Sequence, residues 1–250
     1  MKTIQIIIKK RGFVEVTVDE DIIVFDDEII MKYKIRVGDS FESIIWNNIL
    51  KENNVIIYYN LAIKKLKKMM TTHEIKVYLE SKGASSSTIL EVVKKLKSKK
   101  YLDDELYLKT YISIKKGIYG PKKISYELRQ KGIPFEWIEQ AVQHIDEDQI
   151  IYDLVQKKLS SLKYKSNLQK KLSLKTYLLN KGFSQEAIDH QLNQLAFDDT
   201  DELSNLKKDY EKLFNKLTHL DGYEKKQKIL SKLFQKGYAL SDIKKIMSSS

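Results

Sequence analysis

The fold of this chain is decided by four short stretches: Leu79-Glu80-Ser81-Lys82-Gly83, Leu128-Arg129-Gln130-Lys131-Gly132, Leu178-Leu179-Asn180-Lys181-Gly182 and Leu233-Phe234-Gln235-Lys236-Gly237. All four share the pattern Leu-x-x-Lys-Gly, and their glycines follow one another at 49, 50 and 55 residues. A fixed period of this length is typical of a protein built from tandem structural repeats.

Each column of the repeat has a physical reason. An apolar residue four positions before the leucine shares a helical face with it, since residues i and i+4 are neighbours. Lysine in the last turn faces the negative end of the helix dipole, and glycine can adopt the left-handed conformation that ends a helix. Apolar residues stand eight positions before the glycines (Ile75, Ile124, Leu174, Ile229) and six after them (Ile89, Ile138, Ile188, Ile243).

The positions that follow each glycine predict two further helices per repeat. The first is opened by Ser85 to Ser87, by Pro134, by Ser184 or by Ser241. The second is opened by acidic caps, which are Asp103-Asp104, Asp146 with Gln149, and Asp199 with Glu202. A unit of three helices in about fifty residues has a small core, so neighbouring units should share interfaces. The expected repeats are 71–113, 114–163 and 164–214, with a partial fourth repeat, 215–250, that lacks its third helix as a terminal cap would.

The first 38 residues have a different pattern. β-Branched runs at 4–8, 14–18, 22–25 and 29–35 are separated by glycine or acidic residues, which favours a small antiparallel meander. Asp39 with Glu42 resembles a capping box, so connecting helices are expected over 39–70, with a break at Asn53-Asn54. The predicted fold class is mainly α: an elongated array of tandem three-helix repeats with a small N-terminal antiparallel β-rich domain.

Composition limits the cellular setting and the partners. The formal charge is +11, from 45 basic and 34 acidic residues, which suits a polyanion or an acidic protein surface. Cysteine is absent, so neither disulfides nor thiolate metal sites can form. No apolar run approaches the roughly 18 residues of a membrane span, and no signal-peptide cleavage site follows the N-terminal apolar run. We expect a soluble cytoplasmic protein without a membrane partner.

Candidate catalytic residues do not form a recognisable constellation. The four histidines lack a partner carboxylate at metal-binding spacing, and no phosphate-binding glycine loop or nucleophile turn is present. Helix capping accounts for the pairs Asp103-Asp104 and Asp198-Asp199. We therefore predict no enzymatic activity, no catalytic or metal-binding residues, no cofactor and no small-molecule substrate.

Basic segments carry the functional signal. Eight lysines and no acidic residue lie between Lys157 and Lys181, and a second basic cluster spans 115–131 with Glu127 as its only acid. Basic runs in successive repeats can form a stripe that follows a nucleic-acid backbone or an acidic groove. Interleaved tyrosines such as Tyr119 could stack on bases, although packing at the core edges of the helices is the favoured explanation for most of them. The predicted partner- or DNA-binding residues are Lys115, Lys116, Lys122, Lys123, Arg129, Lys163, Lys165, Lys170 and Lys171.

One region resembles a known family. The run Tyr101-Leu102-Asp103-Asp104, followed by Tyr107, Tyr111 and the segment 120–133 (Gly-Pro-Lys-Lys-Ile-Ser-Tyr-Glu-Leu-Arg-Gln-Lys-Gly-Ile), is similar to the central repeat of the bacterial RecX regulatory proteins. The third repeat departs from this pattern, because it has no Gly-Pro and carries Tyr177 at the position of Glu127. Tyr78 stands at that position in the first repeat.

The resemblance implies a non-enzymatic negative regulator of the RecA recombinase, in DNA recombination, DNA repair and the SOS response. Such proteins lie along the groove of the RecA–DNA filament and limit its growth, ATPase activity and strand exchange, and some also contact single- or double-stranded DNA. Two alternatives stay open. A stand-alone basic DNA-binding repeat protein would show steeply salt-dependent DNA binding without RecA, whereas a structural scaffold would neither bind DNA nor affect the RecA ATPase.

Overall fold

The computed structural model describes residues 1–197 and 199–248, and it divides into two compact units. Met1–Thr110 with Leu128–Phe135 form the first unit, and Tyr111–Glu127 with Glu136–Ser250 form the second. The fold is mainly α-helical, with three-helix domains that follow a small N-terminal antiparallel sheet, as the sequence predicts. Among the described residues, no helix is both long enough and apolar enough to cross a membrane.

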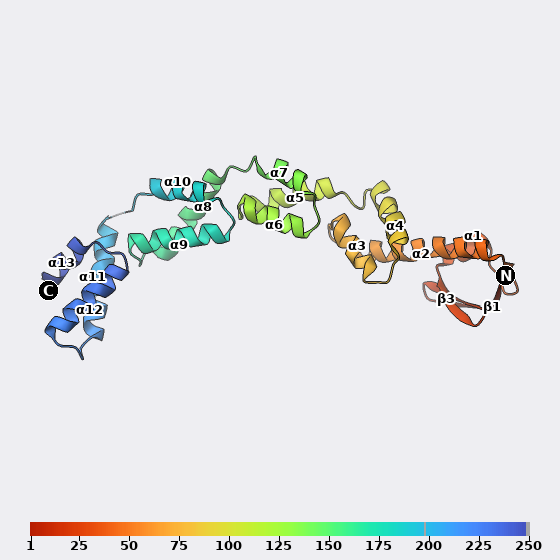
Figure 1. Ribbon diagram of the computed structural model, residues 1–250, viewed down its shortest axis with the longest axis horizontal. Coiled ribbons are helices and arrows are strands. Elements are labelled where there is room, and N and C mark those ends of the chain that lie inside the picture. The colour runs from red at the N-terminus through yellow and green to blue at the C-terminus, as the bar shows by residue number, and fades with distance from the viewer. Residues whose placement is uncertain (198, 249–250) are drawn as a thin grey trace. The chain divides into compact units, whose positions relative to one another are not determined.

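The N-terminal sheet contains β1 (Lys2–Lys10), β2 (Phe13–Val18), β3 (Asp21–Phe25) and the short β4 (Ser40–Phe41). The strand order is β3-β2-β1-β4, and all pairings are antiparallel. Alternating valines of β2 face α1 (Asp27–Tyr33) and α2 (Ser43–Lys65), which Figure 1 shows beside the sheet. The sheet and these helices share one core, formed by Ile4, Val14, Val16, Val18, Phe25, Ile29, Ile35, Trp46, Ile49 and Ile56.

The expected strand over 29–35 is wrong, because this stretch begins as helix α1. Asp26 is its N-cap and accepts a hydrogen bond from the Glu28 N–H at 3.0 Å, while Asp27 and Glu28 place negative charge in the first turn. Ile29 is fully buried against the sheet. The sequence pattern predicts that these acidic residues separate two strands, whereas they form the start of a helix.

The expected helix break at Asn53-Asn54 is also wrong, since α2 continues through both residues to Lys65. Asn53 is buried, and its amide donates to the Val24 carbonyl at 2.8 Å and accepts from the Asp26 N–H at 2.9 Å. These bonds satisfy backbone groups at the end of β3 that the sheet leaves unpaired. A tertiary contact therefore holds a weak helix former inside a long helix.

The expected capping box at the start of α2 does not form. Residues 40–41 pair with β1 as β4, and the helix begins at Ser43 without a side-chain cap. The Asp39 carboxylate instead accepts from the Arg36 N–H at 2.7 Å.

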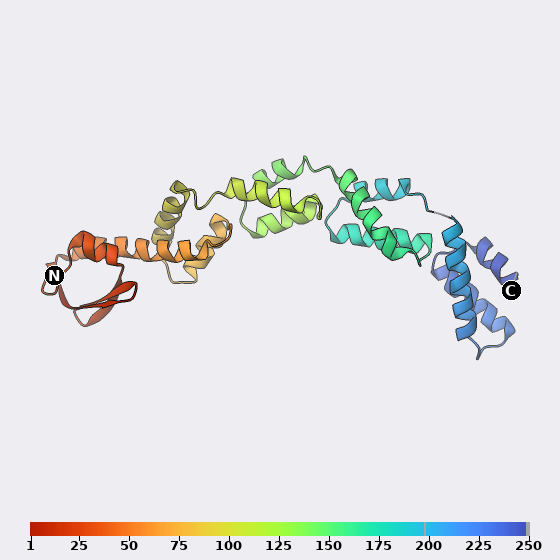
Figure 2. The ribbon, with the colours of Figure 1, turned by 180° about the vertical axis from the view of Figure 1, so that it is seen from behind.

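The rest of the described chain is helical. Its helical elements are α3 (Thr72–Glu80), α4 (Ser86–Ser98), α5 (Asp104–Lys115), α6 (Pro121–Gln130), α7 (Phe135–Val142), α8 (Glu147–Leu159), the 3-10 turn η1 (Ser160–Leu162), α9 (Asn167–Asn180), α10 (Gln185–Gln194), α11 (Asp199–Lys216), α12 (Gly222–Gln235) and α13 (Leu240–Ser248). In the second unit, α8, α9 and α10 lie side by side in both views, and so do α11, α12 and α13 (Figures 1 and 2).

Shared cores group these helices differently from the expected repeats. One core joins α8, α9 and α10, and another joins α11, α12 and α13. In the first unit, the end of α2 shares a core with α3 and α4. The described helical cores thus begin with α2, α8 and α11, and the last of them joins three helices.

Several helix ends form as predicted. Ser85, Ser184, Asp103 and Asp146 each accept a backbone hydrogen bond at the start of a helix. All four repeat glycines have left-handed backbones, with φ of 84°, 72°, 82° and 89° in chain order. Ser241, by contrast, lies inside α13 rather than before it, and Asp198 lies outside the described residues.

The Lys-Gly pair has a second role that the sequence does not reveal. The carbonyl of each repeat lysine accepts a hydrogen bond from a residue far earlier in the chain. The donors are the Tyr58 hydroxyl for Lys82 (3.2 Å), the Thr71 hydroxyl for Lys131 (2.7 Å), the Gly120 N–H for Lys181 (2.9 Å) and the Ser166 hydroxyl for Lys236. In the last three contacts, the donors Thr71, Gly120 and Ser166 directly precede α3, α6 and α9. Each of these helices is the equivalent, in the preceding repeat, of the helix that the lysine ends. We call these contacts repeat joints.

Glycine is required where a joint is tight. A Cβ on Gly182 would stand 2.5 Å from the backbone nitrogen of Lys123, whereas a Cβ on Gly83 would meet only the Tyr58 hydroxyl at 3.8 Å. The Lys122 N–H also donates to the Gly182 carbonyl at 3.1 Å. The start of α6 and the end of α9 are therefore held backbone to backbone.

Candidate nucleic-acid and protein interface

The loop between α5 and α6 carries four of the predicted binding residues. Lys116 and Lys122 are exposed, while Lys115 and Lys123 are half-buried. The Nζ atoms of Lys115 and Lys123 lie 5.4 Å and 4.2 Å from the centroid of the Tyr119 ring. The ring face attracts cations through its quadrupole, so Tyr119 gathers these two charges around one ring.

The repeat joint brings a third lysine to the same ring. Because the Gly120 N–H bonds to the Lys181 carbonyl, the end of α9 lies against this loop. The Lys181 Nζ donates to the Ile118 carbonyl at 3.1 Å and lies 5.1 Å from the Tyr119 centroid. Residues 63 positions apart thereby contribute to one cationic surface.

The predicted residues of the α8–α9 region have mixed environments. Lys163 and Lys165 are exposed, Lys171 is half-buried, and Lys163 lies 4.9 Å from the Tyr164 ring centroid. Lys170 differs, because only 5% of it is exposed and its Nζ donates to the Asn167 side-chain oxygen at 3.1 Å. Lys170 therefore belongs to the interior of its domain, and we remove it from the candidate surface.

Arg129 is exposed near the end of α6, where its guanidinium lies 5.7 Å from the Phe135 ring centroid. It belongs to the first compact unit, whereas the eight predicted lysines belong to the second. The structure therefore brings Lys115 and Lys123 together, and it does not place Arg129 with them.

The candidate residues retain their charge unpaired. None of the nine forms an ion pair with a side chain that the structure describes, whereas other lysines of the same repeats do. Lys175, inside the same acid-free run, pairs with Asp189 at 2.6 Å and holds the pKa of that carboxyl below its ordinary value. The unpaired lysines are thus the ones with charge available for an external anion.

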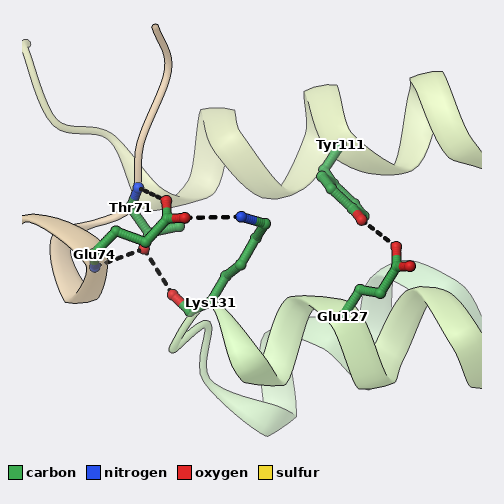
Figure 3. Close-up of polar contacts among 5 residues, drawn as sticks. All are labelled: Thr71, Glu74, Tyr111, Glu127 and Lys131. Atoms are coloured by element: carbon green, nitrogen blue, oxygen red, sulfur yellow. Dashed lines mark hydrogen bonds and ion pairs between the residues drawn. The ribbon is translucent and has the colours of Figure 1, made fainter.

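Two polar contacts of the family-like segment hold it in place (Figure 3). Lys131 donates to the Glu74 carboxylate at 2.8 Å, and Glu74 also accepts from the Thr71 N–H at 3.0 Å. Burial raises the pKa of Glu74, but the hydrogen bonds from Lys131 and Thr71 outweigh it, and the pKa lies below its ordinary value. The same hydrogen bond, opposed by burial, raises the pKa of Lys131. In the other contact, the Tyr111 hydroxyl donates to the Glu127 carboxylate.

Glu127 has a tyrosine at its equivalent position in the first and third repeats and Lys232 in the fourth. Tyr78 and Tyr177 replace this carboxylate, and each ring lies near two lysines. Lys65 and Lys82 approach Tyr78, while Lys158 and Lys181 approach Tyr177 at 5.6 Å and 5.1 Å. In the first and third repeats, a ring therefore gathers cations without neutralising them.

The histidines are held by local contacts. His190 lies 3.2 Å from the Asp148 carboxylate, and this hydrogen bond lowers the pKa of Asp148. His73 packs against Gly132 at a repeat joint. Within residues 1–197 and 199–248, no three histidine or acidic side chains gather in a way that could hold a metal ion.

Sequence reasoning missed two members of this surface. The repeat pattern predicts a helix-capping role for Lys181, and it gives Lys158 no role beyond membership of the acid-free run. That run was the available signal, because eight lysines without an acid leave some of them unpaired. The contact partner across the joint had no signal in the sequence.

Family models match a large part of the chain. The model described as RecX, third three-helix domain, matches residues 146–192 and again 199–247, and the model described as RecX, second three-helix domain, matches residues 103–142. The matched ranges begin near α5, α8 and α11. They agree with the grouping of helices by shared cores.

Curated relatives and solved structures give the same family. The Regulatory protein RecX of Streptococcus pyogenes serotype M4 (strain MGAS10750) is 30% identical over 256 residues, which cover 97% of each chain. The protein of the same name from Bacillus cereus (strain G9842) is 31% identical over 226 residues, 87% of this chain and 84% of the relative. The crystal structure of RecX from Lactobacillus salivarius matches with a TM-score of 0.53 and 26% identity, covering 58% of this chain and 97% of that one. A crystal structure of regulatory protein RecX covers 77% of this chain and 100% of its own, with a TM-score of 0.59 and 18% identity, and is similar in fold.

Proposed function

Because this chain belongs to the RecX family of regulatory proteins, we propose that it is a non-enzymatic negative regulator of the RecA recombinase. In this proposal it binds along the groove of the RecA–DNA filament in the cytoplasm and limits filament growth, ATPase activity and strand exchange. Regulation by binding agrees with the candidate surface, which offers unpaired cations and aromatic rings.

The observation that carries the proposal is the unpaired basic surface on repeats that belong to this family. Lys115, Lys116, Lys122 and Lys123 surround the start of α6, and the last two lie within the segment that carries the family resemblance. A filament of protein and DNA presents many negative groups, so several modest electrostatic contacts can add up along its groove.

The test is a RecA ATPase assay on single-stranded DNA with substoichiometric amounts of the protein. The wild-type chain should slow ATP hydrolysis. A variant with glutamate in place of Lys115, Lys116, Lys122 and Lys123 should not inhibit, while its circular dichroism spectrum keeps the helical signal.

The matched control reverses four exposed lysines of the last domain, Lys207, Lys212, Lys226 and Lys228, which changes the net charge by the same amount. This control should inhibit nearly as well as wild type. Equal inhibition by wild type and by the first variant would reject the proposed role of this surface, and no inhibition by wild type would reject the function itself.

A second candidate function is favoured by the same unpaired charge. A stand-alone DNA-binding protein would bind DNA without RecA and would leave the ATPase rate unchanged once DNA is in excess. Adding excess single-stranded DNA to the assay separates the two, because inhibition through RecA persists and inhibition by DNA sequestration is relieved.

A further inference from the structure

Lys181 connects two aromatic rings into one cationic network. Its Nζ lies 5.1 Å from the centroids of both Tyr119 and Tyr177. Lys115 and Lys123 approach the first ring, and Lys158 approaches the second at 5.6 Å. These four lysines and two tyrosines, which we call the Lys181 network, all belong to the second compact unit.

A polar hollow lies beside this network. It has a volume of about 460 Å³ and is lined by Lys158, Leu172, Ser173, Thr176, Tyr177 and Asn180. Hydroxyl and amide groups supply most of its polar atoms, and its lining includes no carboxylate. Lys165 extends the positive edge, because its Nζ donates to the Ser173 hydroxyl at 2.9 Å.

Charge in the network is not compensated within the chain. Lys115, Lys123, Lys158 and Lys181 form no ion pair with any side chain that the structure describes, although several surface lysines elsewhere do. Three ammonium groups within 5.4 Å of the Tyr119 centroid repel one another. An anion placed between them would relieve this repulsion.

We propose that the Lys181 network and its hollow form a binding site for the phosphodiester backbone of nucleic acid, built across the joint between two repeats. Lysine, serine, threonine and asparagine side chains are the groups that commonly contact backbone phosphates. The network contains no arginine, and its lysines would bind phosphate as compact point charges rather than through two-pronged contacts. The choice of nucleic acid as the ligand rests on the proposed function. The binding of nucleic acid to the network can nevertheless be measured without RecA.

The experiment titrates the full chain into a fluorescent oligothymidylate, and separately into a labelled duplex, and follows anisotropy at several salt concentrations. Lys158→Gln/Lys181→Gln should weaken binding by roughly tenfold and make the plot of log K against log salt shallower by about 1.4 for oligothymidylate and about 1.8 for the duplex, since two phosphate contacts are lost. Lys226→Gln/Lys228→Gln, on the exposed face of α12, removes the same charge outside the network and should change affinity less than about twofold.

A second variant tests whether the site depends on the joint. Gly182→Ala keeps every lysine but places a Cβ 2.5 Å from the Lys123 backbone nitrogen, so it should separate the two halves of the network and weaken binding. Gly237→Ala forces the next joint apart against Leu168 and leaves the network in place, so its affinity should match wild type. Circular dichroism confirms that each variant keeps its helices.

Two results would overturn the site. One is equal affinity of the Lys158/Lys181 variant and its Lys226/Lys228 control for both oligonucleotides. The other is competition by polyglutamate as strong as that by unlabelled oligothymidylate, which would indicate a site for acidic protein. Failure of the wild-type chain to inhibit RecA would reject the proposed function. The DNA affinities of the variants would still decide whether the Lys181 network is a nucleic-acid site.

Discussion

At the scale of single residues, the lysine of the repeat motif differs in role from copy to copy. Lys131 and Glu74 form an ion pair in which 29% and 27% of the side chains are exposed, which shields it from solvent better than a surface pair. Lys131→Met should lower the free energy of unfolding by about 1 kcal/mol. The matched change Lys109→Met removes a fully solvated pair with Glu105 and should leave the thermal midpoint unchanged.

The pH dependence of this pair has a defined direction. The folded pKa of Glu74 is lowered, so its stabilisation is present above the unfolded pKa of about 4.3 and is lost as the pH falls through the folded value. The raised pKa of Lys131 removes the stabilisation only at strongly alkaline pH. The difference in melting temperature between wild type and Lys131→Met should be constant near neutral pH and shrink in acid. A difference that persists at pH 2 would show that lost packing, not the ion pair, is responsible.

Residue environments also set the limit of sequence reasoning about the binding surface. Lys170 and Lys171 are adjacent in an acid-free run, yet Lys170 is buried and Lys171 is half-buried. Helical phase accounts for the difference, because Lys170 lies four residues before Leu174 on the buried face of α9, whereas the Phe197 ring is similarly close to both lysines, at 5.5 Å and 5.9 Å. Charge patterning predicts which segments are basic, and the position of each lysine on its helix determines whether it faces solvent.

At the scale of elements, most helices could be predicted from local signals because caps act within a few residues. Ser85, Ser184 and the repeat glycines form the expected helix ends. The failures, at 29–35 and at Asn53, occur where the N-terminal sheet supplies the deciding contact. A β-branched run is compatible with either strand or helix, and its partner is not encoded nearby.

Asn53 permits a direct test of that contact. Asn53→Ala leaves the Val24 carbonyl and the Asp26 N–H without their partner and should cost about 2 kcal/mol in the N-terminal domain. Asn54→Ala, the exposed neighbour, should be neutral or slightly stabilising because alanine is the better helix former. Urea unfolding followed by the fluorescence of buried Trp46, in a Trp137→Phe background, reports the difference. Equal midpoints for the two variants would contradict the proposed role of the amide.

The repeat joints can be tested with two glycines that share a backbone conformation. Gly83 and Gly182 have φ of 84° and 82°, so alanine at either position costs roughly 1 kcal/mol for the left-handed backbone. Only at Gly182 does the added Cβ meet a neighbouring backbone, at 2.5 Å. Gly182→Ala should therefore lower the melting temperature clearly more than Gly83→Ala. Equal losses would mean that the joint between α6 and α9 contributes little to stability.

At the scale of the whole molecule, the joints explain why a local motif recurs along the chain. The leucine and glycine end a helix, and the lysine carbonyl then receives a donor from the repeat before it. One five-residue pattern thus ends a helix and provides the contact to the preceding repeat. Sequence alone predicts the first role, because in the last three copies the donor lies about 60 to 70 residues earlier in the chain.

The high net charge means that added salt should change stability and binding in opposite directions. A formal charge of +11 disfavours the compact state through self-repulsion, so added salt should raise the melting temperature. The same salt should weaken inhibition of the RecA ATPase, since the proposed contacts are electrostatic.

Reversing Lys115, Lys116, Lys122 and Lys123 to glutamate lowers the formal charge from +11 to +3, because each reversal removes two positive charges. This variant should show a weaker salt dependence of its melting temperature and little inhibition at any salt concentration. The Lys207, Lys212, Lys226 and Lys228 reversal has the same net charge, so its melting temperature should respond to salt in the same way while its inhibition stays salt-sensitive. Loss of inhibition in both variants would assign regulation to total charge, and loss in the first alone would assign it to the surface around α6.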